Sequence, residues 1–176
     1  MKQKTIKLRP ATRQDFDIIE AVHQAAFSVS DFGYNGEGQL ARQLHEAGDA
    51  LVSILAEADG KAVGHVLFSP VKVEADGKPV VAAALAPTGV IPDWQDKGIG
   101  GQLIQAGLAA LKAQGVQLSF AVGNTDYYLR FGYTAEVAKP YESPYAGPYF
   151  LAVSLDRKLK MPKAGKAEFA PAFANF

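Results

Sequence analysis

Apolar and polar residues alternate at the start of this chain and then change to a helical period. Residues 5–9 alternate one by one, as in a half-exposed strand, and Pro10 ends that pattern. The run Thr12-Arg13-Gln14-Asp15 offers an N-cap and an acidic first turn, so a helix should follow to about Phe27. Apolar residues recur in it at helical spacing, namely Ile18, Ile19, Val22, Ala26 and Phe27. We therefore predict a strand followed by an amphipathic helix.

Two Asp-Gly dipeptides divide the middle of the chain into three predicted strands. Asp59-Gly60 separates the apolar runs 51–58 and 61–71, and Asp76-Gly77 leads to the run 80–90. Asp-Gly supplies the positive φ angles of a tight hairpin turn. The third run reads Val-Val-Ala-Ala-Ala-Leu-Ala, a continuous apolar stretch that is typical of a strand covered on both faces. We place this strand at the centre of the sheet.

Helical and extended patterns alternate in the rest of the chain. Residues 28–38 mix Ser, Asp, Gly and Asn and indicate a loop, which a short helix at 39–46 follows. Later elements are a helix at 98–114 ended by Gly115, a buried strand at 117–122, a short helix at 126–131 capped by Gly132 with Tyr133 behind it, and a closing strand at 149–155.

No internal repeat, linker or heptad pattern interrupts the chain, so we predict a single domain over residues 1–160. The tail, residues 161–176, is basic and then rich in Ala and Phe. Its aromatic residues, Phe169, Phe173 and Phe176, either pack against the domain or belong to a mobile end.

Composition limits the possible functions only broadly. The chain has 176 residues and is 48% hydrophobic, which is enough for one well-buried core. Eighteen basic residues balance eighteen acidic ones, so no nucleic-acid or membrane partner is indicated. The absence of cysteine excludes a disulfide framework, a thiolate zinc site and a cysteine nucleophile.

The first residues, Met1 to Lys7, are polar and alternating where a signal peptide would need an apolar run. No stretch approaches the ~18 apolar residues of a membrane span. We therefore expect a cytoplasmic protein.

The most informative stretch for chemistry is a glycine-rich junction between the strand at 80–90 and the helix at 98–114. It reads Gln95-Asp96-Lys97-Gly98-Ile99-Gly100-Gly101. Glycines let a ligand approach the backbone closely, and the free N–H groups and dipole of a helix start attract negative charge. The Lys-Ser or Lys-Thr of a P-loop and the spacing of a dinucleotide fingerprint are both missing. A coenzyme A pyrophosphate and a purely structural helix start remain as interpretations.

Further motifs accompany this junction. Thr88-Gly89-Val90-Ile91-Pro92 precedes it, and Asn124-Thr125-Asp126-Tyr127-Tyr128-Leu129-Arg130-Phe131-Gly132-Tyr133 follows it. With the Gln-x-x-Gly-x-Gly spacing, these motifs resemble the GNAT superfamily of acetyl-CoA-dependent N-acetyltransferases over residues 5–155. The resemblance is to a bacterial subgroup with a doubled tyrosine before an Arg-Phe-Gly-aromatic ending.

The resemblance implies an α/β (α+β) fold, with a mostly antiparallel mixed sheet and helices on both faces. The strands at 80–90 and 117–122 would run parallel and splay apart. The pantetheine arm of acetyl-CoA would fill the gap beside Thr88, Gly89 and Val90, whose backbone would also supply a donor for the acetyl oxygen. The pyrophosphate would lie on Gln95 to Gly101, where Lys97 adds a charge or faces water.

The same resemblance assigns chemistry to Tyr128. Amide formation requires that an ammonium of pKa about 10.4 lose a proton and that the leaving thiolate gain one. Tyr128 occupies the position of the tyrosine that would protonate the thiolate, and Asn124 either contacts pantetheine or only forms a turn. Tyr127 would be structural or line the acceptor site.

The general base that would take the proton of the amine departs from the simplest family pattern. Ala86 stands where the family places a glutamate, and no acidic residue lies between Val80 and Ile91. Glu37, in the predicted acceptor loop, is the leading candidate. The other candidates are Asp31, Glu46 and His65.

Several functional alternatives stay open. The acceptor would be a small amine, an amino acid, an aminoacyl group or a protein amine, held near the Phe27–Gly38 loop and the segment Pro140–Tyr149. A non-catalytic acyl-CoA sensor and an acyltransferase or thioesterase acting on another nucleophile are the rivals, and the lack of a Gly-x-Ser-x-Gly motif argues against a covalent route. We expect no metal and a monomer or homodimer.

Overall fold

The structure is a computed structural model that describes residues 5–176, so the first part of the polar opening segment, Met1 to Lys4, lies outside the described residues. The strands are β1 (Ile6–Pro10), β2 (Val52–Ala58), β3 (Lys61–Ala75), β4 (Lys78–Val90), β5 (Leu118–Val122), β6 (Tyr141–Glu142), β7 (Phe150–Ser154) and β8 (Gly165–Glu168). The helices are α1 (Phe16–Ser28), α2 (Glu37–Glu46), α3 (Ile99–Ala113), α4 (Thr125–Leu129) and α5 (Ala135–Ala138), with short 3-10 turns η1 (Arg13–Asp15), η2 (Pro92–Trp94) and η3 (Pro171–Asn175).

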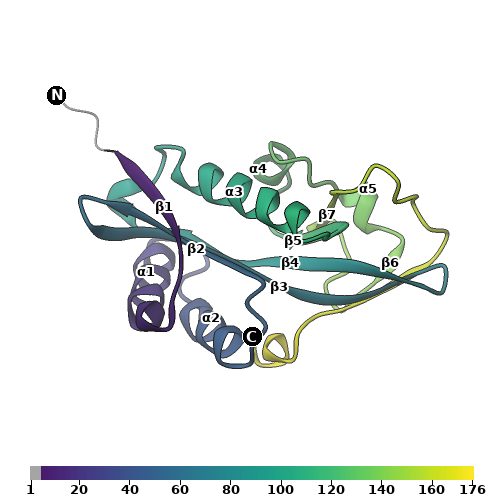
Figure 1. Ribbon diagram of the computed structural model, residues 1–176, viewed down its shortest axis with the longest axis horizontal. Helices are drawn as coiled ribbons and strands as arrows, with labels where there is room; N and C mark the ends of the chain where they lie inside the picture. Colours follow the sequence, from purple (N-terminus) through teal and green to yellow (C-terminus); the bar gives the residue numbers. More distant parts are fainter. Residues whose placement is uncertain (1–4) are drawn as a thin grey trace.

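One mixed sheet forms the centre of the molecule (Figure 1). Its main order is β1-β2-β3-β4-β5-β7, and β8 pairs with the second half of β3, so it continues along the edge that β2 occupies at the first half. Neighbours are antiparallel except for β4 with β5 and the short β6 with β8. The predicted mostly antiparallel sheet with a parallel pair is therefore confirmed.

Both predicted hairpins are present. Asp59 and Gly60 have φ angles of 51° and 76°, and Asp76 and Gly77 have 50° and 78°. Positive φ at both central positions matches the twist of antiparallel strands and closes each turn in two residues. Because the second turn begins only at Asp76, β3 extends four residues beyond the predicted end at Val71.

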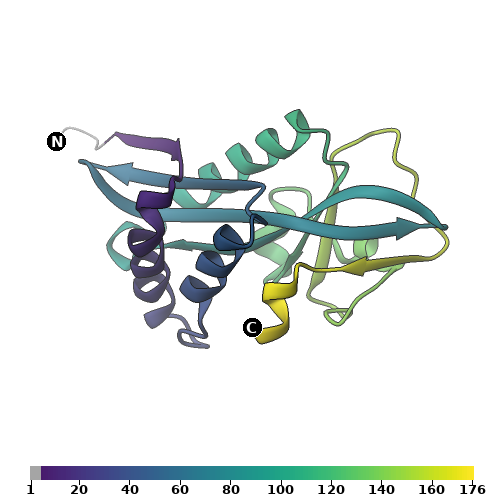
Figure 2. The ribbon, with the colours of Figure 1, turned by 60° about the horizontal axis from the view of Figure 1, so that its bottom comes forward.

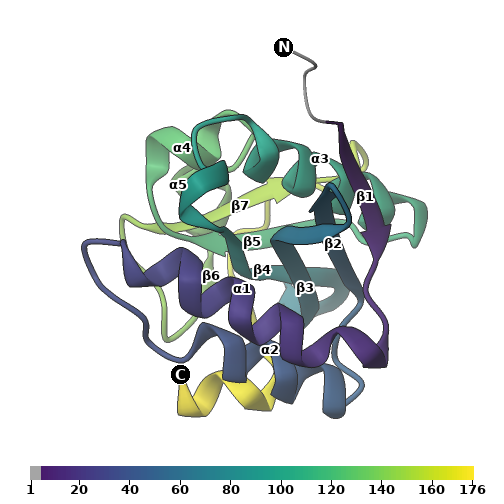
Figure 3. The ribbon, with the colours of Figure 1, turned by 90° about the vertical axis from the view of Figure 1, so that its left-hand side faces the viewer.

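Helices cover both faces of the sheet, as Figures 1 and 3 show: α1 and α2 lie on one face, and α3 lies with α4 on the other. On the α3 side, Ile99, Leu103, Ile104 and Leu111 pack against the sheet. On the α1 and α2 side, the packed residues are Ile19, Leu40, Ala41, Leu44, Leu55 and Leu67. Ile18 was predicted on the apolar face of α1 but is 47% exposed, because its neighbour Ile19 is the residue that points at the sheet.

The C-terminal residues are part of this packing (Figure 2). β8 hydrogen-bonds to the edge of β3, Phe169 contacts the Tyr145 and Phe120 rings, and Phe173 is 7% exposed. Phe176 is half-exposed. The packed structure thus continues past residue 160 into η3. Across residues 5–176, no helix is long and apolar enough to cross a membrane.

Candidate active site

The parallel strands β4 and β5 separate after a short stretch. Their register runs only from Ala82 opposite Leu118 to Ala84 opposite Phe120. Beyond that point β4 continues along β3 to Val90, while β5 turns into α4 after Val122. The edge of β4 from Leu85 to Val90 therefore faces an opening between the two strands, where a ligand could take the place of a missing strand.

A β-bulge lies on β4 within this opening. Val66 pairs with Thr88 and Phe68 with Leu85, so Ala86 and Pro87 together lie opposite a single residue of β3. Bulges bend a strand and redirect the residues after it, and they are frequent beside active sites. β4 is therefore irregular at the end where the strands were expected to splay apart.

The glycine-rich junction follows directly. Asp96 and Gly98 have φ angles of 60° and 80°, and the first i to i−4 hydrogen bond of α3 runs from the Gln102 N–H to the Gly98 carbonyl. The N–H groups of Ile99 to Gly101 thus precede the hydrogen-bonded ladder and point out of the helix start. The Gln95 side chain donates to the Val90 carbonyl at 2.9 Å, which ties the loop to β4.

The residues of the junction differ in what their side chains can do. Ile99 is buried in the core, so only its backbone can contact a ligand. Asp96, Lys97 and Gly98 are exposed. Lys97 also borders a surface cavity of about 910 Å³ with Trp94. The geometry suits an anion held by backbone groups, with Lys97 able to reach it from solvent.

Gly100 and Gly101 have a packing role that sequence reasoning missed. A Cβ at Gly100 would lie 2.9 Å from the Tyr127 hydroxyl oxygen, and one at Gly101 would lie 3.5 Å from the Phe131 ring. These two glycines allow α4 and the turn after it to approach the first turn of α3. The Tyr127 ring, over which Arg130 also lies, is therefore packed against the junction.

Tyr128 lies on α4, the short helix that follows β5. It is 8% exposed, its ring meets the Tyr127 and Tyr133 rings edge to face, and Gly123 leaves room for it. Burial raises the pKa of the Tyr128 hydroxyl well above its usual value, so this hydroxyl stays protonated and able to donate. The described residues contain no hydrogen-bond partner for it.

Asn124 has a structural role in this region. Its side-chain oxygen accepts the Tyr127 N–H at 2.9 Å and caps α4. Asn124 therefore forms the turn that begins α4, which is one of the two roles considered for it. Its amide nitrogen and the second lone pair of its oxygen stay available to a ligand.

Glu37 does not lie in a loop, as was predicted, but is the first residue of α2. Gly36, with φ of 92°, precedes the helix and turns the chain two residues earlier than the apolar pattern indicated. Glu37 is 6% exposed, and its carboxylate accepts the Asn35 N–H at 2.8 Å. Asp31 and Glu46 are both exposed.

A buried histidine that sequence reasoning did not consider, His23, lies beside Gly89 near the bulge of β4. The Nδ1 atom of His23 lies 3.1 Å from the position that a Cβ would take at Gly89, and His23 is 0% exposed. Its other ring nitrogen contacts His65, which stands opposite Gly89 on β3. In the sequence, the only sign of this buried position was that His23 falls on the apolar side of the α1 helix, between Ile19 and Phe27.

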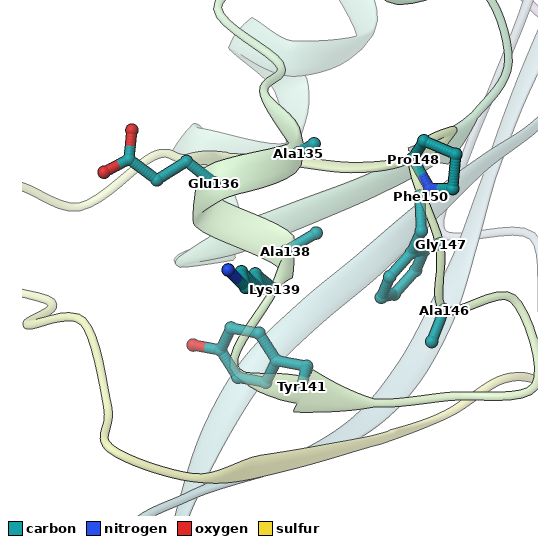
Figure 4. Close-up of a pocket in the computed structure, with 9 residues that line it drawn as sticks. All are labelled: Ala135, Glu136, Ala138, Lys139, Tyr141, Ala146, Gly147, Pro148 and Phe150. Atoms are coloured by element: carbon teal, nitrogen blue, oxygen red, sulfur yellow. The ribbon is translucent and has the colours of Figure 1, made fainter.

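The predicted aromatic segment Pro140–Tyr149 divides between two places. Tyr141 and Tyr145 pack against Phe120 and Phe169, whereas the Tyr149 carbonyl accepts the Gly123 N–H beside the opening. A cavity of about 680 Å³ lies next to the segment, and Figure 4 shows the residues that line it. Its lining residues are Ala135, Glu136, Ala138, Lys139, Tyr141, Ala146, Gly147, Pro148 and Phe150, so neither Tyr128 nor the bulged end of β4 borders it.

Comparison with known proteins agrees with this geometry. The profile described as "Acetyltransferase (GNAT) domain" matches residues 7–135, about three quarters of the chain. The chain belongs to the GNAT acetyltransferase family. As a member of this family it is an acyl-CoA-dependent N-acetyltransferase. Among its relatives is the uncharacterized N-acetyltransferase YjhQ of Escherichia coli, which is 38% identical over 144 residues, covering 72% of this chain and 80% of YjhQ.

Solved structures share the GNAT fold. A GNAT family acetyltransferase from Brucella melitensis, in complex with acetyl-CoA, has a TM-score of 0.78 and 30% identity, over 96% of this chain and 98% of that one. YhbS from Escherichia coli, in complex with CoA, has a TM-score of 0.83 and 24% identity, over 100% and 96% of the two chains. Within residues 5–176 of the GNAT chain, no cluster of three or more His, Cys, Asp or Glu could hold a metal ion.

Proposed function

We propose that this chain transfers the acetyl group of acetyl-CoA to a primary amine, by direct attack in a ternary complex. The observation that supports this best is the opening between β4 and β5, which ends at the glycine-rich helix start. The opening suits an extended arm such as pantetheine, and the helix start suits an anion such as pyrophosphate. Coenzyme A contains both groups. The Brucella relative was solved with acetyl-CoA.

The residues present fit such a molecule. The backbone of Thr88, Gly89 and Val90 would pair with the pantetheine arm, and that of Gln95 to Gly101 would hold the pyrophosphate. Lys97 would add a charge and Asn124 an amide. The bound acetyl-CoA supplies an acyl group activated as a thioester. The chain's part is to hold that group at the bulge, exclude water and move protons.

Tyr128 is the proposed acid. Tyr128 as a whole is 8% exposed, and its hydroxyl is protonated and has no hydrogen-bond partner in the described residues, which leaves it able to give a proton to a leaving thiolate. Glu37 is one candidate for the base, although its carboxylate already accepts a backbone N–H. The position at which a glutamate was expected on β4 holds Ala86, which packs against the α1 and α2 cluster.

Calorimetric titration with acetyl-CoA, with CoA and with ATP as a control tests the binding part. We expect micromolar binding of both coenzyme forms and none of ATP. Release of free CoA thiol would then be followed against small amines, amino acids, aminoacyl compounds and peptide amines. No binding of either coenzyme form would overturn the proposal.

The lack of an acidic residue on β4 favours one alternative, an acyl-CoA sensor without activity. It predicts tight coenzyme binding and no thiol release with any amine. A thioesterase would instead release thiol without an amine. The same titration and thiol measurements therefore separate all three functions.

A further inference from the structure

The three histidines of the chain belong to one hydrogen-bonded series on the face of the sheet that α1 and α2 cover. His23 Nε2 lies 2.8 Å from His65 Nδ1, and His65 Nε2 lies 2.8 Å from the Ser53 hydroxyl. That hydroxyl lies 2.8 Å from His45 Nε2, and His45 Nδ1 lies 2.7 Å from the Ala41 carbonyl. We call this series the histidine chain. It runs from α1 through β3 and β2 to α2.

The Ala41 carbonyl determines the direction of every bond in the histidine chain. A carbonyl only accepts, so His45 Nδ1 carries a proton and the neutral ring leaves Nε2 as an acceptor for the Ser53 O–H. The Ser53 oxygen then accepts from His65 Nε2–H, which leaves His65 Nδ1 to accept from His23 Nε2–H. The last lone pair of the series therefore falls on His23 Nδ1.

The surroundings keep the histidine chain neutral. Burial lowers the pKa of His23 to about 3 and that of His65 well below 6.5, and it also lowers that of the half-buried His45. Among charged groups, Asp15 on η1 acts on His65, and it is itself paired with Arg9. Each ring can then pass a proton on while taking one up.

The free end of the histidine chain lies at the site. His23 Nδ1 is buried and has no hydrogen-bond partner in the described residues. It faces Gly89, in the β4 segment proposed to hold the thioester, from the α1 side of the sheet. An unpaired buried acceptor is costly unless a ligand satisfies it. The other end is open, because Ser53 and His45 are only partly buried.

We propose that His23 Nδ1 takes a proton from the acceptor amine and that the histidine chain passes a proton through His65 and Ser53 to His45 and then to water. The proposal deepens the proposed function and rests on it. It supplies the base that β4 lacks. Since the positive charge arrives on His45, it need not remain on the fully buried His23.

The protons balance. An alkylammonium loses two protons on becoming an amide, and one S–H bond forms on the released thiol. One of the two protons leaves through the histidine chain. The nitrogen gives it to His23 Nδ1, His45 Nε2 gains a proton from Ser53, and the Nδ1 proton of His45 leaves the Ala41 carbonyl for water, after which the rings return to their starting tautomers. The other replaces the proton that the Tyr128 hydroxyl gives to the thiolate. The C–N bond forms as the C–S bond breaks, and no oxidant or reductant is needed.

Ser53→Ala interrupts the histidine chain with the loss of one hydroxyl, and Ser69→Ala is the matched control. Ser69 is another buried serine of the sheet, but its hydroxyl has no hydrogen-bond partner in the described residues. Two amines of similar size serve as probes: ethylamine, which is protonated near pH 7, and 2,2,2-trifluoroethylamine, which is largely neutral there. Thiol release from acetyl-CoA is the readout.

With ethylamine, Ser53→Ala should lower turnover about 10²-fold, while Ser69→Ala stays within about twofold of the native protein. With trifluoroethylamine, Ser53→Ala should lose less than about threefold, because this amine needs no base before attack. An equal loss with both amines would show a structural role and overturn the proposal. So would a loss with ethylamine in Glu37→Gln but not in Ser53→Ala.

A second measurement needs no activity. Imidazole ¹⁵N resonances of the native protein near pH 7 should show protonated Nδ1 only at His45, and unprotonated Nδ1 at His23 and His65. Protonated Nδ1 at His23 would overturn the proposal. Titration of Ser53→Ala with acetyl-CoA should show native affinity, so failure of coenzyme binding counts against the proposed function and leaves the histidine chain to be judged by its tautomers.

Discussion

At the scale of single residues, burial decides which groups can act. Tyr128 and the three histidines are uncharged near pH 7 because charging them in the interior is costly. Sequence reasoning selected Tyr128 through a motif, but it could not rank His23. A histidine on the inner face of a helix is more often a core residue, and only the facing strand shows what its ring contacts.

Replacing Tyr128 with Phe should lower turnover about 10²-fold and leave acetyl-CoA affinity nearly unchanged, because only the proton donor is removed. Steady-state thiol release and calorimetry measure the two quantities. Tyr145→Phe is the control, since Tyr145 packs against Phe169 away from the opening. Unchanged turnover in Tyr128→Phe would remove this residue from the mechanism.

Acid should destabilise the protein at a pH where most carboxylates are still ionised. The pKa of His23 is 6.5 when exposed and about 3 when folded, so below pH 6.5 the unfolded chain binds a proton that the folded chain does not. Stability from this group is full above pH 6.5 and is lost as pH falls toward 3. From pH 7 to pH 5, His23 alone should lower the free energy of unfolding by about 2 kcal/mol.

Urea denaturation at the two pH values measures this effect, and His65 should add to it in the same direction. Asp15 acts in a separate window: its folded pKa lies below 3.8, so its contribution is lost only at lower pH. Equal stability at pH 7 and pH 5 would mean that the histidines are solvated or already charged in the folded state.

At the scale of elements, the glycine-rich start of α3 is both the proposed pyrophosphate site and the surface against which α4 packs. Sequence analysis assigned Gly100 to the approach of a ligand, whereas the structure brings the Tyr127 hydroxyl to the same glycine. Helix-to-helix contacts of this kind depend on where α4 lies in space. The local pattern of residues 95–101 does not contain that information.

A double-mutant cycle tests this contact. Gly100→Ala should lower the free energy of unfolding by about 1 kcal/mol, because the methyl group forces Tyr127 or α4 to move. Adding Tyr127→Phe removes the hydroxyl and should recover most of that loss, with a coupling energy of at least about 0.5 kcal/mol by urea denaturation. Additive effects would show that the two residues do not touch.

At the scale of the whole molecule, the C-terminal residues complete the sheet. β8 covers the edge of β3 that β2 leaves open, and the phenylalanines after it cover apolar residues at the far end of the sheet. The sequence left these residues between a packed and a mobile state. Whether they pack depends on the edge of β3 that β8 pairs with, and this edge exists only once β2 and β3 have paired.

Phe173→Ala should lower the free energy of unfolding by about 3 kcal/mol, because a buried aromatic ring is replaced by a cavity. Phe176→Ala is the matched control, at the residue that directly follows η3. Its ring is 51% exposed, so the cost should stay below about 1 kcal/mol. Chemical denaturation of both variants measures the difference, and equal costs would contradict the packing described here.

The sequence by itself determined the main strands and helices and their order, but not α5, β6 and β8. It also determined both Asp-Gly hairpins, the glycine-rich helix start and the family, because each depends on local spacing and turn chemistry. Only the tertiary structure decided where α2 begins, what Gly100 contacts, that the tail joins the sheet, and that His23, His45, His65 and Ser53 meet. These residues lie on four different elements. Their hydrogen bonds arise from strand register and helix docking, which no local pattern encodes.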